Sequence, residues 1–249
     1  MAKIISFANH KGGVGKTTTV ASVAAFMARG GKRVLAVDLD AQSNLTSSLL
    51  GREADSSVYD ALRTRGDLPV YEIGEGLHLV PSSLELAGIE LELASAMSRE
   101  YILKDLLDKV SADYDYILLD CPPALSLVTV NAFVASDHVI IPLTAEALPF
   151  KGLKMITDIM EMVKQRLNPD LKLSGILLTR WAGRKLNKLV EESLRENYGD
   201  TVFRTRIREN IAVAEAPLAA QDVFSYSSRC NGARDYGDFA KELIQVLEK

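Results

Sequence analysis

Apolar runs alternate with helical patterns through most of the chain. Six short apolar runs predict strands, at 3–8, 33–39, 77–81, 116–121, 138–143 and 173–179. Most of these runs are continuously apolar, which is typical of parallel strands that are covered on both faces. Six segments between and after them have helical patterns, at 16–29, 99–110, 126–135, 151–166, 184–198 and 233–248. The alternation predicts an α/β fold with a doubly wound, mostly parallel sheet and helices on both faces.

No repeat, low-complexity tract or long linker interrupts this pattern. We therefore expect residues 1–249 to form a single domain, which is a normal size for one large α/β unit. The segment 51–76 is rich in Gly, Asp and Glu and is the least regular part of the chain. We expect it to lie exposed on the surface.

Composition narrows the class of protein. The chain is 47% hydrophobic and 25% charged with a net charge of −4, and it has neither a secretory signal pattern nor an apolar run long enough for a membrane span. Its two cysteines, Cys121 and Cys230, are far apart and outside any C-x-x-C pair. This argues against a disulfide scaffold, a zinc ribbon or an iron–sulfur site within one chain. We expect a cytoplasmic protein.

The stretch "FANHKGGVGKTTT", residues 7–19, joins the first predicted strand to the first predicted helix. A phosphate-binding loop of the form G-x-x-x-x-G-K-[ST] needs this context. Gly15, Lys16 and Thr17 match the pattern, but His10 stands where the first glycine belongs. Glycines in such a loop let several backbone N–H groups converge on phosphate oxygens at a helix N-terminus.

Each side chain after the loop has a task in this interpretation. Lys16 would neutralise the β- and γ-phosphates, Thr17 would ligate Mg²⁺ through its hydroxyl, and Thr18 would contact the α-phosphate. The nucleotide-binding residues predicted in this loop are Gly12, Gly13, Val14, Gly15, Lys16, Thr17 and Thr18.

Carboxylates stand at the ends of two predicted strands. Asp120 ends strand 116–121, as does an aspartate that holds Mg²⁺ through water, and strand 33–39 brings Asp38 and Asp40. A single aspartate after a strand usually caps a turn or a helix. Three of them beside a phosphate loop favour metal and water, so we predict a site for a nucleoside triphosphate with Mg²⁺.

Longer motifs support a family resemblance. "KGGVGKTTT", "VLAVDLDAQSN" and "YDYILLDCPPALSLVTVNAF" resemble the deviant Walker A ATPases of the ParA/MinD group, and above all its Soj-like ParA branch. The resemblance continues through "HVIIPLTAEALPFKGL", "IRENIAVAEAP" and "NGARDYGDFAKEL", so it covers nearly the whole chain. It implies a slow ATP hydrolase with ATP and Mg²⁺ as cofactors, a homodimer with ATP sandwiched between subunits, and a ParB-like activator.

The resemblance also assigns residues. It implies that Lys11 reaches across the dimer to the partner's phosphates, which explains a second lysine beside Lys16. Asp40 resembles the catalytic aspartate that orients water, Asp120 and Asp38 belong to the Mg²⁺ site, and Asn210 contacts adenine. The chain departs from the family at Ala41, where Pro is frequent, and in "IREN", where I-P-R-N is frequent.

Relatives with other cycles remain alternatives. A MinD-like membrane ATPase would end in a basic amphipathic helix, whereas "DFAKELIQVLEK" is mixed in charge, so we expect no membrane partner. A ParA-like positioner of a protein cargo stays open. Because the first strand begins at Lys3, we expect no N-terminal helix-turn-helix and no operator binding.

Charge indicates a DNA partner. Residues 180–234 hold ten basic and seven acidic residues, a local charge of +3 in an acidic chain. A basic region of this kind suits contact with phosphates of any sequence. If "FRTRIRE" is extended, its alternating arginines lie on one side. The predicted contacts to non-specific double-stranded DNA, with nucleoid association, are Arg206, Arg208, Arg229 and Arg234.

Overall fold

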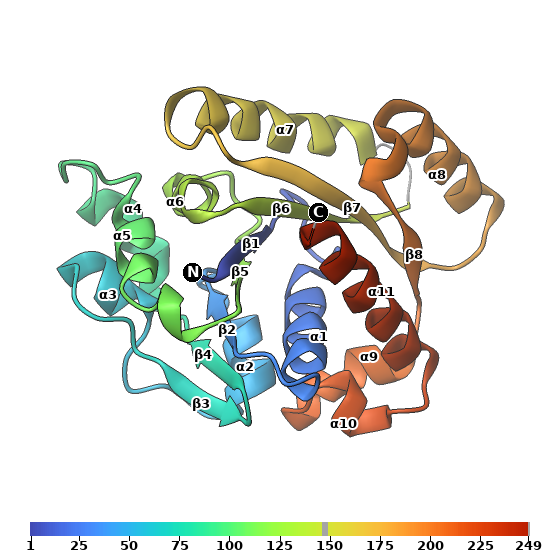
Figure 1. The fold of residues 1–249 in the computed structure, drawn as a ribbon, viewed down its shortest axis with the longest axis horizontal. Coiled ribbons are helices and arrows are strands. Elements are labelled where there is room, and N and C mark those ends of the chain that lie inside the picture. The colour runs from blue at the N-terminus through green and yellow to red at the C-terminus, as the bar shows by residue number, and fades with distance from the viewer. Residues whose placement is uncertain (146–148, 249) are drawn as a thin grey trace.

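A computed structural model describes residues 1–145 and 149–248 of the chain. Its strands are β1 (Lys3–Phe7), β2 (Val34–Asp38), β3 (Tyr71–Gly74), β4 (Leu77–Val80), β5 (Tyr116–Asp120), β6 (His138–Thr144), β7 (Lys172–Trp181) and β8 (Val202–Arg208). They form one sheet in the order β3-β4-β2-β5-β1-β6-β7-β8 (Figure 1). Every neighbouring pair is parallel except β3 and β4.

Helices cover both faces of this sheet (Figure 1). The α-helices are α1 (Lys16–Arg29), α2 (Asn44–Leu50), α3 (Val58–Thr64), α4 (Ile89–Glu92), α5 (Ile102–Asp108), α6 (Leu127–Ala135), α7 (Pro149–Arg166), α8 (Lys185–Tyr198), α9 (Ile211–Glu215), α10 (Val223–Ser227) and α11 (Asn231–Leu247). Short 3₁₀ turns are η1 (Leu84–Gly88), η2 (Ser111–Asp113), η3 (Gly199–Thr201) and η4 (Ala216–Ala219).

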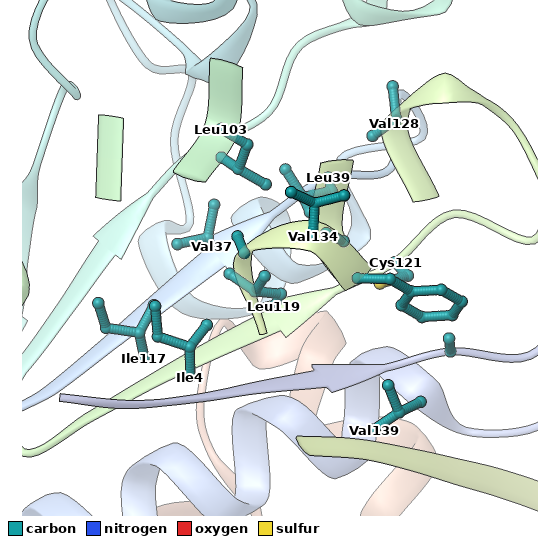
Figure 2. Close-up of a cluster of buried hydrophobic side chains, with 14 of the residues drawn as sticks. Ile4, Val37, Leu39, Leu103, Ile117, Leu119, Cys121, Val128, Val134 and Val139 are labelled. Atoms are coloured by element: carbon teal, nitrogen blue, oxygen red, sulfur yellow. The ribbon is translucent and has the colours of Figure 1, made fainter. Parts of the chain in front are cut away.

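Two separate apolar clusters explain why the strands are continuously apolar. Ile4 packs with α5, α6 and α7 on one face of the sheet, and its neighbour Ile5 packs with α1 and α11 on the other. Figure 2 shows the first cluster, in which Val37 and Leu119 from the sheet lie near Val134 of α6. Since alternate side chains of each strand enter different cores, both faces need apolar residues. The predicted doubly wound fold is confirmed.

The structure corrects the expectation for the segment 51–76. This segment contains α3 and the edge strand β3, and α3 buries Val58 and Leu62. At the N-terminus of α3, the Asp60 carboxylate accepts a hydrogen bond from the Ser57 backbone N–H at 2.9 Å. A helix of two turns is too short to show clear periodicity, which is why its sequence was not recognised as helical.

The topology places one edge of the sheet as the site. From β1 the chain crosses to β2 on one side, and later strands continue with β6 on the other side of β1. Ligands of open α/β sheets bind at the carboxyl ends of strands where the winding reverses in this way. The register pairs Asp120 with both Phe7 of β1 and Asp38 of β2, so both carboxylates end adjacent strands beside the phosphate loop.

Candidate nucleotide and magnesium site

The phosphate loop runs between β1 and α1 in a conformation that requires glycine. Gly13 has a φ of +72° and Gly15 a φ of +84°, which L side chains rarely adopt. Beneath the loop, the buried Val14 presents its carbonyl oxygen to the Thr179 hydroxyl at 2.8 Å. Val14 therefore anchors the loop on β7, and its side chain does not face the ligand space.

A cavity of about 1040 Å³ opens in front of this loop. It brings together most of the predicted nucleotide residues with a wall formed by the chain after β8. Lys16 is buried but lines this cavity, so its ammonium group is held where a phosphate would need it. The predicted site residues that line the cavity are Gly12, Gly13, Gly15, Lys16, Thr17, Thr18, Asp40, Arg208 and Asn210.

Asp120 is the least satisfied polar group at the site. Its side chain is fully buried, and neither carboxylate oxygen has a hydrogen-bond partner among the described residues. Burial, reinforced by the nearby charge of Asp38, raises the pKa of Asp120 well above its usual value, and Lys16 opposes this rise. A buried carboxylate without partners suits an absent cation and its water. These residues fit Mg²⁺, because Thr17 adds a hydroxyl on the first turn of α1.

Asp38 has a different environment. One carboxylate oxygen accepts the Thr46 backbone N–H and hydroxyl, both at 2.8 Å, and the other accepts the Asp40 N–H at 3.1 Å. Burial raises the pKa of Asp38 to about 6 against these hydrogen bonds. Asp38 thus holds the chain that carries Asp40, and its metal role stays a prediction. Among residues 1–145 and 149–248, no three His, Cys, Asp or Glu side chains form a ready metal site by themselves.

Asp40 and Asn210 lie on opposite sequence arms of the same cavity. Asp40 is partly exposed, and its Oδ1 accepts the Gln42 N–H at 3.0 Å. Asn210 precedes α9, and its buried Oδ1 has no partner in the described part of the chain. Beside Asn210 the wall is apolar, with Ile211 and Val213. This end of the cavity suits a flat base with an amino group that can donate to Asn210.

Two lining residues have no signal in the sequence. Tyr236 of α11 and Thr179 of β7 both border the cavity, and the Tyr236 hydroxyl lies 3.5 Å from that of Thr19. Burial raises the pKa of Tyr236 to about 12, so it stays neutral. Both residues reach the site through long-range packing, so only the folded chain reveals them.

The structure divides the four arginines predicted to bind DNA. Arg206 makes two hydrogen bonds to the nearly buried Glu191, at 2.8 and 2.6 Å, and lies 4.9 Å over the Trp181 ring. Arg208 pairs with Asp235 in the same bidentate way. Arg229 and Arg234, in contrast, are exposed and make no ion pair with any described residue.

Lys11 lies on the exposed side of the loop and outside the cavity lining. Its backbone N–H donates to Asn9 Oδ1 at 3.0 Å. The resemblance stretch 138–153 includes residues 146–148, which lie outside the described residues. None of the helices within the described ranges combines the length and apolarity needed to cross a bilayer.

A phosphate loop at a reversal of the sheet, with a buried aspartate at the next strand end, defines a P-loop nucleotide-binding protein. Comparison with known proteins gives the family. A family model described as an AAA domain matches residues 2–173. The sporulation initiation inhibitor protein Soj of Bacillus subtilis is 42% identical over 98% of both chains. The chain belongs to the ParA/Soj-like ATPases.

Two further relatives agree with this assignment. The chromosome partitioning protein ParA of Caulobacter vibrioides is 37% identical over 97% of this chain and 94% of that protein. A solved structure from Mycobacterium smegmatis, named cobyrinic acid a,c-diamide synthase and holding an ATP analogue and magnesium, is 34% identical with a TM-score of 0.87. It covers 100% of this chain and 97% of its own.

Proposed function

We propose that this chain binds ATP with Mg²⁺, dimerises around the nucleotide, and hydrolyses ATP to ADP and phosphate slowly until a ParB-like activator acts. The observation that carries the nucleotide chemistry is the buried, partnerless carboxylate of Asp120 beneath a phosphate loop. The relatives named Soj and ParA support partition of chromosome, plasmid or mobile-element DNA as the purpose. The Mycobacterium smegmatis structure is named as a synthase, so it supports the ligands and not the purpose.

The side chains divide the work between binding and hydrolysis. Lys16 and the N–H groups of the loop hold the phosphates, and the bare glycines allow the backbone to approach them. Magnesium, held by the Thr17 hydroxyl and through water by Asp120, would neutralise phosphate charge. Asp40 orients the attacking water from the cavity wall. Lys11, exposed beside the cavity, neutralises phosphates of the partner subunit, as an arginine finger supplied in trans does.

The dimer presents its basic surface to DNA of any sequence, which places it in the cytoplasm on the nucleoid. A protein cargo positioned by the same cycle is the alternative. A membrane cycle is less favoured, because α11 buries Phe239, Leu243 and Leu247 against the rest of the domain. Those apolar residues are unavailable for a lipid surface.

The two lysines test this proposal, because they are expected to fail differently. Lys16→Ala should abolish ATP binding, since the triphosphate loses its main counter-charge. Lys11→Ala should keep monomer affinity and lose ATP-dependent dimers and stimulated hydrolysis. Nucleotide titration and light scattering on both variants measure this. Equal loss of nucleotide affinity in the two variants would remove the cross-dimer role of Lys11.

A further inference from the structure

His10 stands where phosphate loops of the usual pattern carry glycine, and its ring lies directly against helix α7. A Cβ atom placed on Gly152 would be 2.1 Å from His10 Cε1 and 2.5 Å from Nδ1. No side chain fits between the ring and the helix backbone, because real Cβ contacts stay beyond about 3 Å. The glycine missing from the loop is therefore present across the contact, in the first turn of α7.

The same short stretch is held from a second side. Asn9 is buried, its Nδ2 donates to the Pro142 carbonyl of β6 at 2.6 Å, and its Oδ1 accepts the Lys11 N–H at 3.0 Å. The His10 Nδ1 atom is buried and has no hydrogen-bond partner in the described ranges. The ring is thus positioned by packing, and β6 and α7 enclose residues 9–11 between them.

We propose that the contact between His10 and Gly152 is a positioning element for Lys11. The bare backbone of α7 admits the imidazole, and the packed ring fixes the direction in which the Lys11 backbone leaves the loop. This proposal rests on the proposed function, which gives Lys11 its task across the dimer. A long side chain that must reach a second subunit gains most from a fixed starting point, because less freedom is lost on association.

Gly152→Ala tests the contact, because alanine is the better helix former and should harm α7 only by displacing the ring. We expect ATP affinity of the monomer to stay near the wild-type value. ATP-dependent dimerisation should weaken by about 10²-fold, the cost of a displacement near 1 Å in a positioned group. His10→Gly in the same chain removes the ring that clashes. The double variant should therefore regain at least tenfold of the lost dimerisation, a non-additive result.

Three controls make the outcome decisive. Lys154→Ala changes an exposed residue of the same helix, whose ion pair with Asp158 is also exposed, and should dimerise as wild type. Urea unfolding of each variant shows that the domain is intact. If Gly152→Ala does not fold, His10→Ala gives the same reading, with normal monomer affinity and weaker dimers.

The results separate the two hypotheses. A wild-type protein that stays monomeric with ATP overturns the proposed function, and the task of Lys11 with it. A wild type that dimerises, beside a Gly152→Ala variant that dimerises equally well, overturns only the positioning role. A double variant as weak as Gly152→Ala alone also overturns it, because the defect would then come from α7 and not from the ring.

Discussion

Asp120→Asn should stabilise the protein in the absence of Mg²⁺ and nucleotide. The substitution keeps the shape of the side chain and removes a negative charge that is fully buried and partnerless within the described residues. Burial and the Asp38 charge make the ionised form unfavourable in the folded state. The amide avoids this charge, so the folded state gains relative to the unfolded one at neutral pH.

The sign of the pH dependence follows from the raised pKa values. A carboxyl whose folded pKa is raised binds its proton more tightly when folded, so the free energy of unfolding falls as pH rises above the unfolded pKa. For Asp38 this loss runs from pH 3.8 to about 6. It amounts to about 3 kcal/mol at about 1.4 kcal/mol for each pH unit. Replacing the unsatisfied Asp120 should return about 1–3 kcal/mol at pH 7.5.

Urea unfolding between pH 5 and 8 measures this effect. The variant should show a higher midpoint than wild type at pH 7.5, a smaller difference at pH 5, and less stabilisation by added Mg²⁺ and ATP. Asp113→Asn, which changes an exposed carboxylate in η2, is the control and should leave the midpoint unchanged. An Asp120→Asn protein that is less stable than wild type at pH 7.5 without Mg²⁺ would refute the reasoning.

Three other substitutions have definite expected outcomes. Asp40→Ala should slow phosphate release by about 10²–10⁴-fold while ATP-bound dimers persist in light scattering, and a normal rate would exclude Asp40 from water activation. Gly15→Ala should lose about 1–2 kcal/mol in urea unfolding, because φ is +84° there, and unchanged stability would show that the loop relaxes. Arg229→Glu with Arg234→Glu should weaken ATP-dependent binding equally for two unrelated duplexes in anisotropy titrations. It should also flatten the salt dependence, whose slope is about −0.9 per phosphate contact, and unchanged binding would place the DNA surface elsewhere.

The sequence predicted those elements whose stabilisation is local or repeated. Helix α1 was predicted within its observed bounds, and the central strands were recognised from continuous apolar runs. The edge strand β8 was not predicted as a strand. In it Phe203 and Ile207 face the core beside α11, while the residues between them are polar and exposed or half-buried. Such a half-buried edge strand looks polar in a window of this length, and its pairing with β7 depends on distant residues.

The site divides along the same line. The phosphate loop and Asp120 were legible because each lies directly after a strand, where chemistry and local structure coincide. The hydrogen bonds from Thr46 to Asp38 and the place of Tyr236 on the cavity wall depend on how helices dock on the sheet. Side-chain pairing across such distances leaves no periodic trace in a sequence.

The arginines show how this limit affects a functional prediction. The alternation in "FRTRIRE" did put Arg204, Arg206 and Arg208 on the exposed side of an extended strand. Their partners, Glu191 of α8 and Asp235 of α11, come from elsewhere in the chain and take up two of the three charges.

A glutamate at Arg208 would face Asp235, which is nearly buried, and would also change the wall of the nucleotide cavity. Lost DNA binding in such a variant could then follow from lost folding or lost ATP. Arg180 and Arg195 are paired too. The basic residues of 180–234 that have no acidic partner within 4.0 Å in the described structure are Arg184, Lys185, Lys188, Arg204, Arg229 and Arg234. A phosphate backbone would meet these charges without first breaking an ion pair, so substitutions there separate DNA binding from nucleotide binding.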